Sequence, residues 1–494
     1  MSTIKKFASQ TALYGIATVA SRILNFFLTP IYTRVFDKKV YGVFTEMYSY
    51  ASILNALLSF GMETTFFRYI NKKGDQKEAV YANTFIVVLC TSAIFLATTL
   101  IFIDPIAAWV QDERLVSVAE YKTYIKFFVF ILVIDAISVV PFAKVRADGR
   151  PGRYSLIKLI NVLTFIGLNL FFIFVIPYII KNQSFGAAYF QEWYRNNWIG
   201  YVFVANLIAS LLTLFLLIPE LLQLKLKLHK DLALEMFTYS WPVLVANLSF
   251  IINENVDKIF LSHLLPANIS NAQVGIYGAC SKIAIFLSIF IMAFRLGAEP
   301  FFFSYAKNEN AGKTYAFIMD YFVLAISLIF VGVVANIELL KNFIAPEYWV
   351  GLDVVPILLF GYVSLGIYMN LSIWYKLSDQ TKYGLYISGI GALVTIVLNL
   401  LFIPKYGFMA SAWVSLTAYT SMMILSYILG QKNYAIPYHL KRNVAYLMAS
   451  IILVWLSYIY FNKSLIIGNI LFVGFGLVIL YLERSQIKKI LSSL

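Results

Sequence analysis

Long apolar stretches recur along the chain and alternate with short segments that carry most of the charged residues. A helix needs about 20 apolar residues to cross a bilayer, and fourteen stretches come close to that length. No connection between them exceeds about twenty residues, which leaves no room for an inserted soluble domain. The pattern predicts an all-α polytopic membrane protein. Its spans are expected at 7–32, 41–61, 79–103, 122–145, 154–180, 198–218, 237–261, 273–299, 315–339, 352–375, 383–403, 408–429, 442–461 and 466–482.

The first predicted span places polar or small residues on one face, around an arginine. They recur at intervals of three or four, which puts them on one stripe of a helix: Thr11, Gly15, Thr18, Arg22, Asn25 and Thr29. A charged arginine near the centre of a membrane helix costs about 2.5–3.5 kcal/mol. We therefore expect the stripe to line a water-filled cavity. The alternative is that Arg22 pairs with a buried carboxylate and joins two helices.

Composition supports the membrane assignment. Of the 494 residues, 61% are hydrophobic and 13% are charged, whereas soluble domains are about 45–50% apolar and about 25% charged. The net charge of +14 is compatible with nucleic-acid binding, but the basic residues are spread over short connections and form no single patch. With the N-terminus inside, the inner segments hold 23 lysines and arginines and the outer segments hold nine. This asymmetry predicts that both termini are cytoplasmic, and no nucleic-acid partner is expected.

The two halves of the chain resemble each other. The fifth predicted span contains Leu-Asn-Leu-Phe-Phe-Ile at 168–173, and the eleventh contains Leu-Asn-Leu-Leu-Phe-Ile at 398–403, an offset of 230. Tyr41-Gly42 and Tyr277-Gly278 match at an offset of 236. We therefore expect two parallel six-helix repeats around a central cavity, with the substrate site between them. The expected parts are an N-lobe at 1–232, a C-lobe at 233–440, and two additional helices with a short cytoplasmic tail at 441–494.

Most ionisable residues within the spans fall in the first two helices of each repeat. Such residues are costly in a membrane and commonly mark a substrate or ion path. The candidate contacts for an anionic substrate are Arg22, Asn25, Lys258, Lys282 and Arg295. The candidate groups for ion or proton coupling are Glu46, Asp135, Glu254 and Asp257. The alternative is that these charges neutralise one another between helices, and for Arg295 with Glu299 four residues later we favour such a pair.

Other chemistries find little support in the sequence. Cys90 and Cys280 lie within apolar stretches, which favours packing roles over a disulfide or a metal cluster. The three histidines are scattered near the ends of the predicted spans: His229, His263 and His439. We find no glycine-rich loop of the kind that cradles phosphates, so an ATPase module is not expected. No cofactor and no metal are expected.

Several motifs resemble a known family. Three segments near the N-terminus are similar to the start of polysaccharide-biosynthesis flippases: Thr29-Pro-Ile-Tyr-Thr-Arg34-Val-Phe, Tyr41-Gly-Val-Phe and Phe60-Gly-Met-Glu-Thr-Thr-Phe-Phe-Arg68. Two segments of the second half resemble the same family: Val274-Gly-Ile-Tyr-Gly and Pro404-Lys-Tyr-Gly-Phe-Met-Ala-Ser-Ala-Trp413. These flippases are the O-antigen or exopolysaccharide translocases of the multidrug/oligosaccharidyl-lipid/polysaccharide exporter superfamily. The similarity covers essentially the whole chain.

The resemblance implies two six-helix lobes that open alternately to the two sides of the bacterial inner membrane. It implies that an oligosaccharide on polyprenyl diphosphate is flipped from the cytoplasmic to the periplasmic leaflet, for lipopolysaccharide or another surface polysaccharide. Because no covalent bond changes, the protein is not expected to be an enzyme. In the related lipid II flippases, cavity arginines are proposed to hold the diphosphate, and the last two helices help to form a groove for the lipid tail; Arg22 has a comparable place in the first helix. The expected partners are the lipid-linked glycan, membrane lipids, Na⁺ or H⁺, and polysaccharide polymerase or chain-length proteins.

Two other functions remain open at the level of sequence. A cation-coupled multidrug or metabolite antiporter of the same superfamily usually has twelve helices, so the last two predicted spans count against it. A membrane polysaccharide polymerase or glycosyltransferase would normally carry a sizeable outer loop with catalytic carboxylates, and the outer loops here are short. The sequence does not identify the glycan or the coupling ion.

Overall fold

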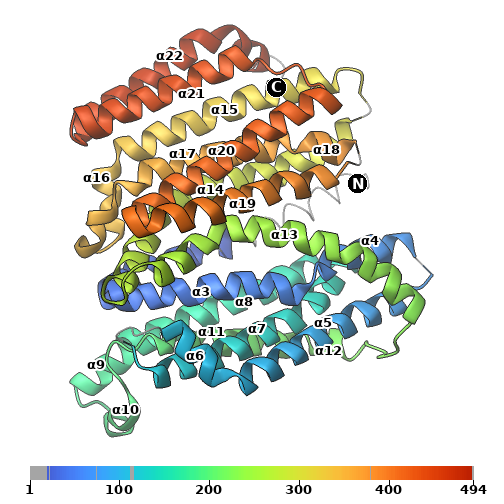
Figure 1. Cartoon of the computed structure of the whole chain (residues 1–494), viewed down its shortest axis with the longest axis vertical. Coiled ribbons are helices and arrows are strands. Elements are labelled where there is room, and N and C mark those ends of the chain that lie inside the picture. The colour runs from blue at the N-terminus through green and yellow to red at the C-terminus, as the bar shows by residue number, and fades with distance from the viewer. Residues whose placement is uncertain are drawn as a thin grey trace. The chain divides into compact units, whose positions relative to one another are not determined.

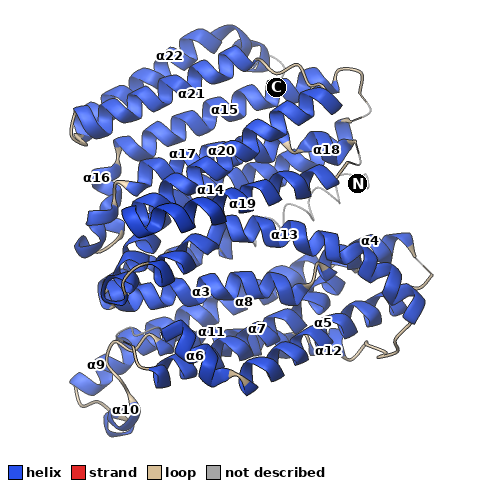
Figure 2. Cartoon of the chain, viewed as in Figure 1, coloured by secondary structure: helices blue, strands red, loops and turns tan. Residues whose placement is uncertain are grey.

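The computed structural model describes residues 19–21, 23–73, 75–111, 116–306, 308–378 and 380–491. Nearly all of these residues are helical, and this part of the chain contains no β-strand (Figure 2). Helices satisfy their backbone hydrogen bonds internally, as a chain that crosses lipid requires. The prediction of an all-α polytopic membrane fold is confirmed.

Ten helices of the described chain are long and apolar enough to cross a membrane. They coincide with ten of the predicted spans: Lys77–Ile101, Val118–Ala147, Pro151–Lys181, Ala267–Phe303, Ala311–Ala335, Val354–Leu377, Lys382–Tyr406, Phe408–Asn433, Leu440–Tyr460 and Leu465–Ser485.

The count of fourteen spans remains a prediction. Helix α11 (Gly200–Leu216) lies at the sixth predicted span and is a shorter apolar helix. Helices α3 (Lys38–Ser59) and α13 (Lys230–Leu264) lie at the second and seventh, and their polar residues lower their mean hydropathy. The first predicted span lies largely outside the described residues.

The chain divides into two compact units. Figure 1 labels the helices and colours them by residue number. Unit 1 consists of 1–278 and 395–407, and unit 2 consists of 279–394 and 408–494. The division expected from the sequence repeat, at 232 and 440, remains a prediction. Unit 1 holds α2 (Thr29–Val35), α3, α4 (Met62–Lys72), α5 (Lys77–Ile101), α6 (Ile103–Gln111), α7 (Val118–Ala147), α8 (Pro151–Leu170), a π-helical turn (Phe171–Val175), α9 (Ile176–Lys181), α10 (Ala187–Trp193), α11, α12 (Ile218–Leu221), α13, and parts of α14 (Ala267–Tyr305) and α19 (Lys382–Tyr406).

The core of unit 1 forms around the short helix α4. Met62 and Phe66 of α4 are fully buried and belong to one hydrophobic cluster with Val140 of α7. Helix α3 ends at Ser59, and the next two residues, Phe60 and Gly61, adopt left-handed backbone conformations with φ of 48° and 66°. The chain therefore turns sharply from α3 into α4. Within lipid, such clusters are held by close packing more than by removal from water.

Unit 2 holds the rest of α14 and α19, together with α15 (Ala311–Ala335), α16 (Ile337–Leu340), two 3₁₀ turns (Lys341–Phe343 and Pro346–Gly351), α17 (Val354–Leu371), α18 (Ile373–Leu377), α20 (Phe408–Asn433), α21 (Leu440–Trp455), a π-helical turn (Leu456–Tyr460) and α22 (Leu465–Leu491). Helix α17 packs on α20 where Gly361 faces Leu416; a Cβ on Gly361 would lie 3.5 Å from the Leu416 Cα. Helices α21 and α22 both pack on α15.

The two cysteines have different surroundings. Cys280 is fully buried, and its thiol donates to the Tyr348 carbonyl oxygen at 3.3 Å within unit 2. Cys90 is exposed on α5 of unit 1. Neither forms a disulfide.

Candidate functional site

The first-span stripe is only partly visible in the structure. Arg22, with Thr11, Gly15 and Thr18, lies outside the described residues, so its predicted role stays a prediction. Asn25 is described: it is exposed, and its carbonyl oxygen accepts a hydrogen bond from the Leu28 N–H at 3.2 Å.

Glu46 lies in a buried polar cluster between α3 and α13 of unit 1. Its side chain is fully buried, and its Oε1 lies 3.8 Å from His263 Nε2. The Tyr50 hydroxyl lies 2.6 Å from the same His263 nitrogen and donates to Glu46 Oε1 at 3.4 Å. Trp109 stacks on the imidazole with ring centroids 4.5 Å apart. A buried carboxylate is expensive unless polar groups surround it, and Tyr50 and His263 supply such groups.

Glycine lets α3 and the first turns of α14 approach almost backbone to backbone. A Cβ on Gly275 would lie 1.9 Å from the Lys38 carbonyl oxygen, and one on Gly42 would lie 1.8 Å from the Asn271 carbonyl oxygen. Real side chains never show such distances, so these positions accept glycine alone without a shift of the helices. Small residues at helix contacts are the usual means of close approach in membranes.

Asp257 and Lys258 form an ion pair on α13, next to α14. The Lys258 ammonium lies 2.8 Å from Asp257 Oδ1 and donates to the Glu254 carbonyl oxygen at 2.5 Å. The Tyr277 hydroxyl donates to Asp257 Oδ2 at 2.7 Å. Three of the predicted site residues therefore lie together within unit 1. Because Asp257 is 1% exposed, its paired state avoids the high cost of an isolated buried charge.

Asp135 lies apart from these groups, on α7. The Ser210 hydroxyl of α11 hydrogen-bonds its carboxyl group, and Lys158 of α8 is the nearby cation. Ser210 and Lys158 lie in unit 1, so their interactions with Asp135 connect α7 to α11 and to α8. This arrangement suits a structural contact at least as well as an ion-coupling site.

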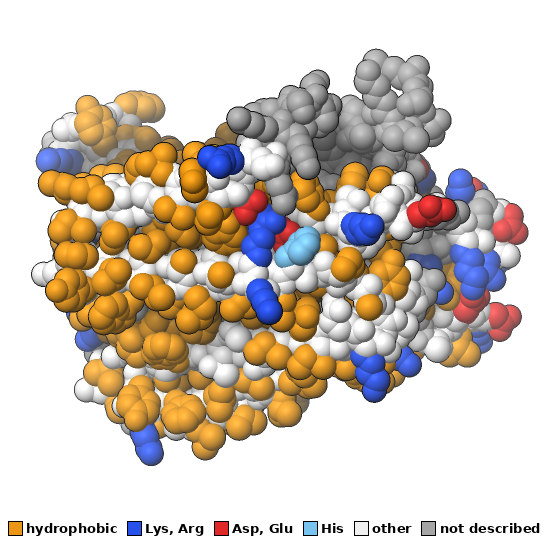
Figure 3. All heavy atoms as spheres, turned by 90° about the horizontal axis from the view of Figure 1, so that it is seen from above, with side chains coloured by type: hydrophobic (Ala, Val, Ile, Leu, Met, Phe, Trp, Pro, Cys, Tyr) orange, Lys and Arg blue, Asp and Glu red, His pale blue; other side chains and the backbone are white. Residues whose placement is uncertain are grey.

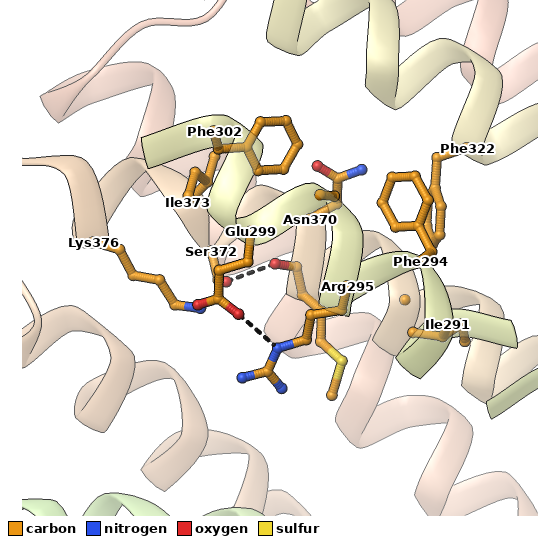
Figure 4. A pocket seen from close by; sticks show the side chains of 13 residues that line it. Ile291, Phe294, Arg295, Glu299, Phe302, Phe322, Asn370, Ser372, Ile373 and Lys376 are labelled. Atoms are coloured by element: carbon orange, nitrogen blue, oxygen red, sulfur yellow. Dashed lines mark hydrogen bonds and ion pairs between the residues drawn. The ribbon is translucent and has the colours of Figure 1, made fainter. Parts of the chain in front are cut away.

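Unit 2 contains a second charged group, at the C-terminal part of α14. Glu299 Oε2 lies 3.1 Å from Arg295 Nε, which confirms the expected pair at i and i+4. Glu299 Oε1 also lies 2.6 Å from Lys376 Nζ on α18. Figure 4 shows Arg295 and Lys376 reaching Glu299 from different sides, while the amide of Asn370 points away toward Phe302 and Phe322. The adjoining cavity of about 20 Å³ holds about one water molecule.

Lys282, the remaining predicted contact, is partly buried on α14 in unit 2. The predicted basic residues thus divide between the units, with Lys258 in unit 1 and Lys282 and Arg295 in unit 2.

The Leu-Asn-Leu repeat marks two buried asparagines. In unit 1, Asn169 accepts a hydrogen bond from the Tyr32 hydroxyl at 2.8 Å and donates to the Phe165 carbonyl oxygen. Asn399, its counterpart in the repeat, is fully buried, and its side-chain amide has no hydrogen-bond partner among the described residues. Four residues before it, Thr395 donates to Asn253 of α13 at 2.8 Å. The repeat therefore places an asparagine at the same buried position in both copies, although the hydrogen bonds of the two asparagines differ.

Unit 2 also contains an apolar groove of about 680 Å³ between α21 and α22. Small residues hollow it, among them Ala445, Ala449 and Gly474. Arg442 and Tyr446 line it near the start of α21, and both bind Glu483 of α22, at 2.7 and 2.8 Å. Hydrophobic side chains cover much of the face in Figure 3, with one compact group of acidic, basic and histidine side chains among them.

Arg442, at the charged end of the groove, also takes part in contacts that connect α21 and α22 to α15. Arg442 lies 3.5 Å from the buried Asp320, and His439 Nδ1 lies 2.7 Å from the same carboxylate. The charges are therefore largely compensated, and the groove walls stay apolar.

Sequence reasoning missed several of these residues. Tyr50 and Trp109 carry no charge, and His263 is 217 positions from Glu46, so no short-range pattern joins them. Lys376 is also absent from the predicted site residues. A signal for it existed, because intramembrane carboxylates such as Glu299 usually find a basic partner.

The comparisons with known proteins now bear on these features. A model of the polysaccharide biosynthesis protein family matches residues 7–305, more than half of the chain. The chain belongs to this family. The model of the MatE family matches residues 242–401. Among curated protein sequences, none matches.

Solved structures share the fold of this family member. Lipid II flippase MurJ in an inward closed conformation matches with a TM-score of 0.69 and 14% identity, over 96% of this chain and 100% of that one. An inward-facing multidrug resistance MATE family transporter of the MOP superfamily matches with a TM-score of 0.59 and 14% identity, over 89% and 96%. The MATE transporter VcmN of Vibrio cholerae, in its bent form, matches with a TM-score of 0.57 and 13% identity, over 89% and 98%. The chain is thus a multi-pass membrane protein with the fold that MurJ and MATE transporters share.

Proposed function

We propose that the protein is an alternating-access flippase for an oligosaccharide linked to polyprenyl diphosphate. The observation that carries the proposal is the apolar groove of about 680 Å³ between α21 and α22. A substrate with a long hydrocarbon tail needs such a surface, whereas a compact drug or metabolite does not. Membership in the polysaccharide biosynthesis family supports the same substrate class.

In this mechanism the three parts of the substrate remain in different surroundings. The diphosphate is the costliest part to move through hydrocarbon, and basic groups replace its lost hydration. We assign that role to Arg22, with Asn25, Lys258, Lys282 and Arg295. The glycan stays in water within a central cavity, and the prenyl tail lies along the groove. Rocking of one six-helix lobe against the other would then deliver the head group to the far side.

We further propose the bacterial inner membrane as the location, with both termini cytoplasmic. The excess of basic residues in the predicted inner segments supports this orientation. The head group would move toward the periplasmic leaflet, where polymerase and chain-length proteins would use it for surface polysaccharide. Glu46, Asp135, Glu254 and Asp257 are the candidates for coupling this movement to Na⁺ or H⁺.

Translocation in proteoliposomes tests the proposal. The purified full chain is reconstituted with a fluorescent oligosaccharide on undecaprenyl diphosphate, and a membrane-impermeant quencher reports how much substrate reaches each leaflet. We expect protein-dependent exchange between leaflets, and no exchange of a phospholipid carrying the same dye. Failure to move the lipid-linked glycan would refute the proposal.

A cation-coupled antiporter is the second candidate. The MatE match and the buried carboxylates Glu46 and Asp257 favour it. Efflux of a cationic dye from the same liposomes, driven by an imposed Na⁺ or H⁺ gradient and without flipping of the glycan lipid, would support this function instead. Glycan chain extension in the assay would indicate a polymerase or glycosyltransferase.

A further inference from the structure

The carboxylate of Glu299 stands between two cations of unit 2. It lies 2.6 Å from Lys376 Nζ and 3.1 Å from Arg295 Nε (Figure 4). One negative charge thus serves two positive ones, and the group has an excess of one positive charge. The Arg295 side chain is 50% exposed, so its guanidinium remains accessible to a further anion. The cavity of about 20 Å³ beside these groups has room for about one water molecule and is too small for a phosphate.

The first repeat contains the same carboxylate. Gly61-Met-Glu-Thr-Thr-Phe-Phe and Gly297-Ala-Glu-Pro-Phe-Phe-Phe share glycine, glutamate and two phenylalanines at an offset of 236. This is also the offset between Tyr41-Gly42 and Tyr277-Gly278. In unit 1, Glu63 binds Arg146 at the end of α7. Arg146 and Lys376 both follow the fourth predicted span of their repeats, although their offset is 230 and that of the glutamates is 236, so the two ion pairs have similar places in the repeats.

The two copies differ in one respect that bears on binding. Among the described residues, Glu63 has one basic partner, and the Arg146 guanidinium also lies 4.7 Å from the centre of the Phe67 ring. Glu299 has the additional partner Arg295, whose counterpart at the same offset is Ser59. In each repeat, the ion pair between the glutamate and the basic residue after the fourth span connects the second span to the fourth. Arg295 is not needed for that connection in unit 2, because Lys376 already makes it.

We propose that Glu299 is an exchangeable counter-anion for a diphosphate-binding pair of cations, Arg295 and Lys376. The inference rests on the proposed function, since it specifies which part of the lipid-linked substrate meets this group. Without substrate, the carboxylate holds both cations in place and offsets one of their two positive charges. An arriving diphosphate displaces the carboxylate, and the return of the carboxylate promotes release. Glu299 is therefore a positioning residue.

Charge and geometry explain why such an exchange works in both directions. A diphosphate carries more charge and more acceptor oxygens than a carboxylate, and guanidinium binds phosphate oxygens in a bidentate manner. It therefore replaces Glu299 when it is present. A transported ligand must also leave, and an anion tethered next to the cations competes with it at every moment.

Equilibrium binding to the full chain in nanodiscs tests the proposal. The ligands are geranylgeranyl diphosphate, inorganic diphosphate and geranylgeraniol, which lacks the diphosphate. We expect Glu299→Gln to bind both diphosphates roughly three- to tenfold more tightly, and Lys376→Gln to bind them more weakly by a similar factor. The matched control Glu63→Gln removes the equivalent carboxylate from the first repeat and should stay within about twofold of wild type. Geranylgeraniol binding should not change in any variant.

A purely structural role predicts a different result. In that case Glu299→Gln and Glu63→Gln would lower thermal stability and diphosphate binding alike, and such a result would overturn the inference. The transport rate gives a second readout: Glu299→Gln should lower the turnover number while lowering KM. Absence of any diphosphate binding by wild type would also refute the inference, whereas the flippase proposal fails only if the glycan lipid is not translocated.

Discussion

Glu46 and His263 show how single residues keep a charge inside a membrane protein. The carboxylate is fully buried, and it shares the Tyr50 hydroxyl with the imidazole. Trp109 covers the imidazole on one face. At this scale the polar groups form small, matched sets, and removing one member takes a polar contact away from another.

His263→Ala should therefore destabilise the protein. The substitution removes the 2.6 Å contact with Tyr50 and the stacking on Trp109, and we expect a loss of about 1–3 kcal/mol of unfolding free energy. Thermal unfolding in detergent, followed by tryptophan fluorescence, measures it. The exposed His229 offers a comparison, because its hydrogen bonds with Asn83 involve only its backbone. An equal loss for His229→Ala would argue against a special role for the His263 cluster.

Arg22 belongs to the same scale, although it lies outside the described residues. If it contacts the diphosphate, Arg22→Ala should abolish flipping in the proteoliposome assay while insertion and abundance stay at wild-type levels. Arg22→Lys keeps the charge and should retain part of the activity, because lysine lacks the bidentate geometry. Normal flipping by Arg22→Ala would return the residue to a structural role.

At the scale of elements, backbone contacts decide which substitutions a helix accepts. Gly275→Ala would place a methyl group against the Lys38 carbonyl oxygen, so α3 and α14 must separate. We expect a loss of at least about 1–3 kcal/mol in stability, as for other overpacked contacts. Gly389→Ala on α19 is the matched control, because nothing lies within 4 Å of its added Cβ. It should be neutral or slightly stabilising, and an equal loss in both variants would contradict the close-contact explanation.

The ion pairs between α4 and α13 have a defined pH dependence. The hydrogen bond from Lys72 lowers the pKa of Glu235 below its ordinary value of 4.5, and Lys73 acts in the same direction. Glu235 lies before the predicted span of α13. A lowered folded-state pKa means that the stabilisation is present above the unfolded-state pKa and is lost as the pH falls through the folded-state pKa.

We expect this contribution to be below about 1 kcal/mol, because the Glu235 side chain is 37% exposed. Glu235→Gln should thus lower the unfolding temperature slightly at neutral pH and low salt. The difference from wild type should vanish at acid pH and at high salt, as thermal scans across both conditions will show. A difference that grows at acid pH would contradict this sign.

The sequence predicted the positions of helices well, but it did not predict helix breaks or the contacts between helices. Hydropathy located the ten described spans because the apolar length of a helix is a local property. The break at Phe60–Gly61 was not predictable, since glycine also occurs inside continuous helices, as Gly297 does in α14. The Glu46–His263 cluster was equally hidden, because its members meet only after α3 and α13 pack. The Arg295–Glu299 pair could be predicted because it forms within one helix turn.

At the scale of the whole molecule, the groove between α21 and α22 is the feature that distinguishes the two proposed functions, because a flippase needs a surface for the lipid tail and an antiporter does not. Gly474→Phe should fill the groove, since nothing lies within 4 Å of a Cβ at this position. We expect flipping of the undecaprenyl substrate to fall several-fold, while an analogue with a short prenyl chain is less affected. Val473→Phe adds similar bulk to an exposed position of α22 outside the groove lining and should leave both rates unchanged. Equal inhibition of both substrates by Gly474→Phe would exclude the tail-binding role.

The pair of cysteines has a practical consequence for watching the molecule move. Cys280 is buried and contacts Tyr348, whereas the Cys90 side chain is exposed on the surface of α5. Replacing Cys90 alone would therefore give a background that takes up no spin label or fluorophore while the fold is intact. New cysteines placed one in each unit could then carry a pair of probes, and the distance between the probes could be followed as substrate is added.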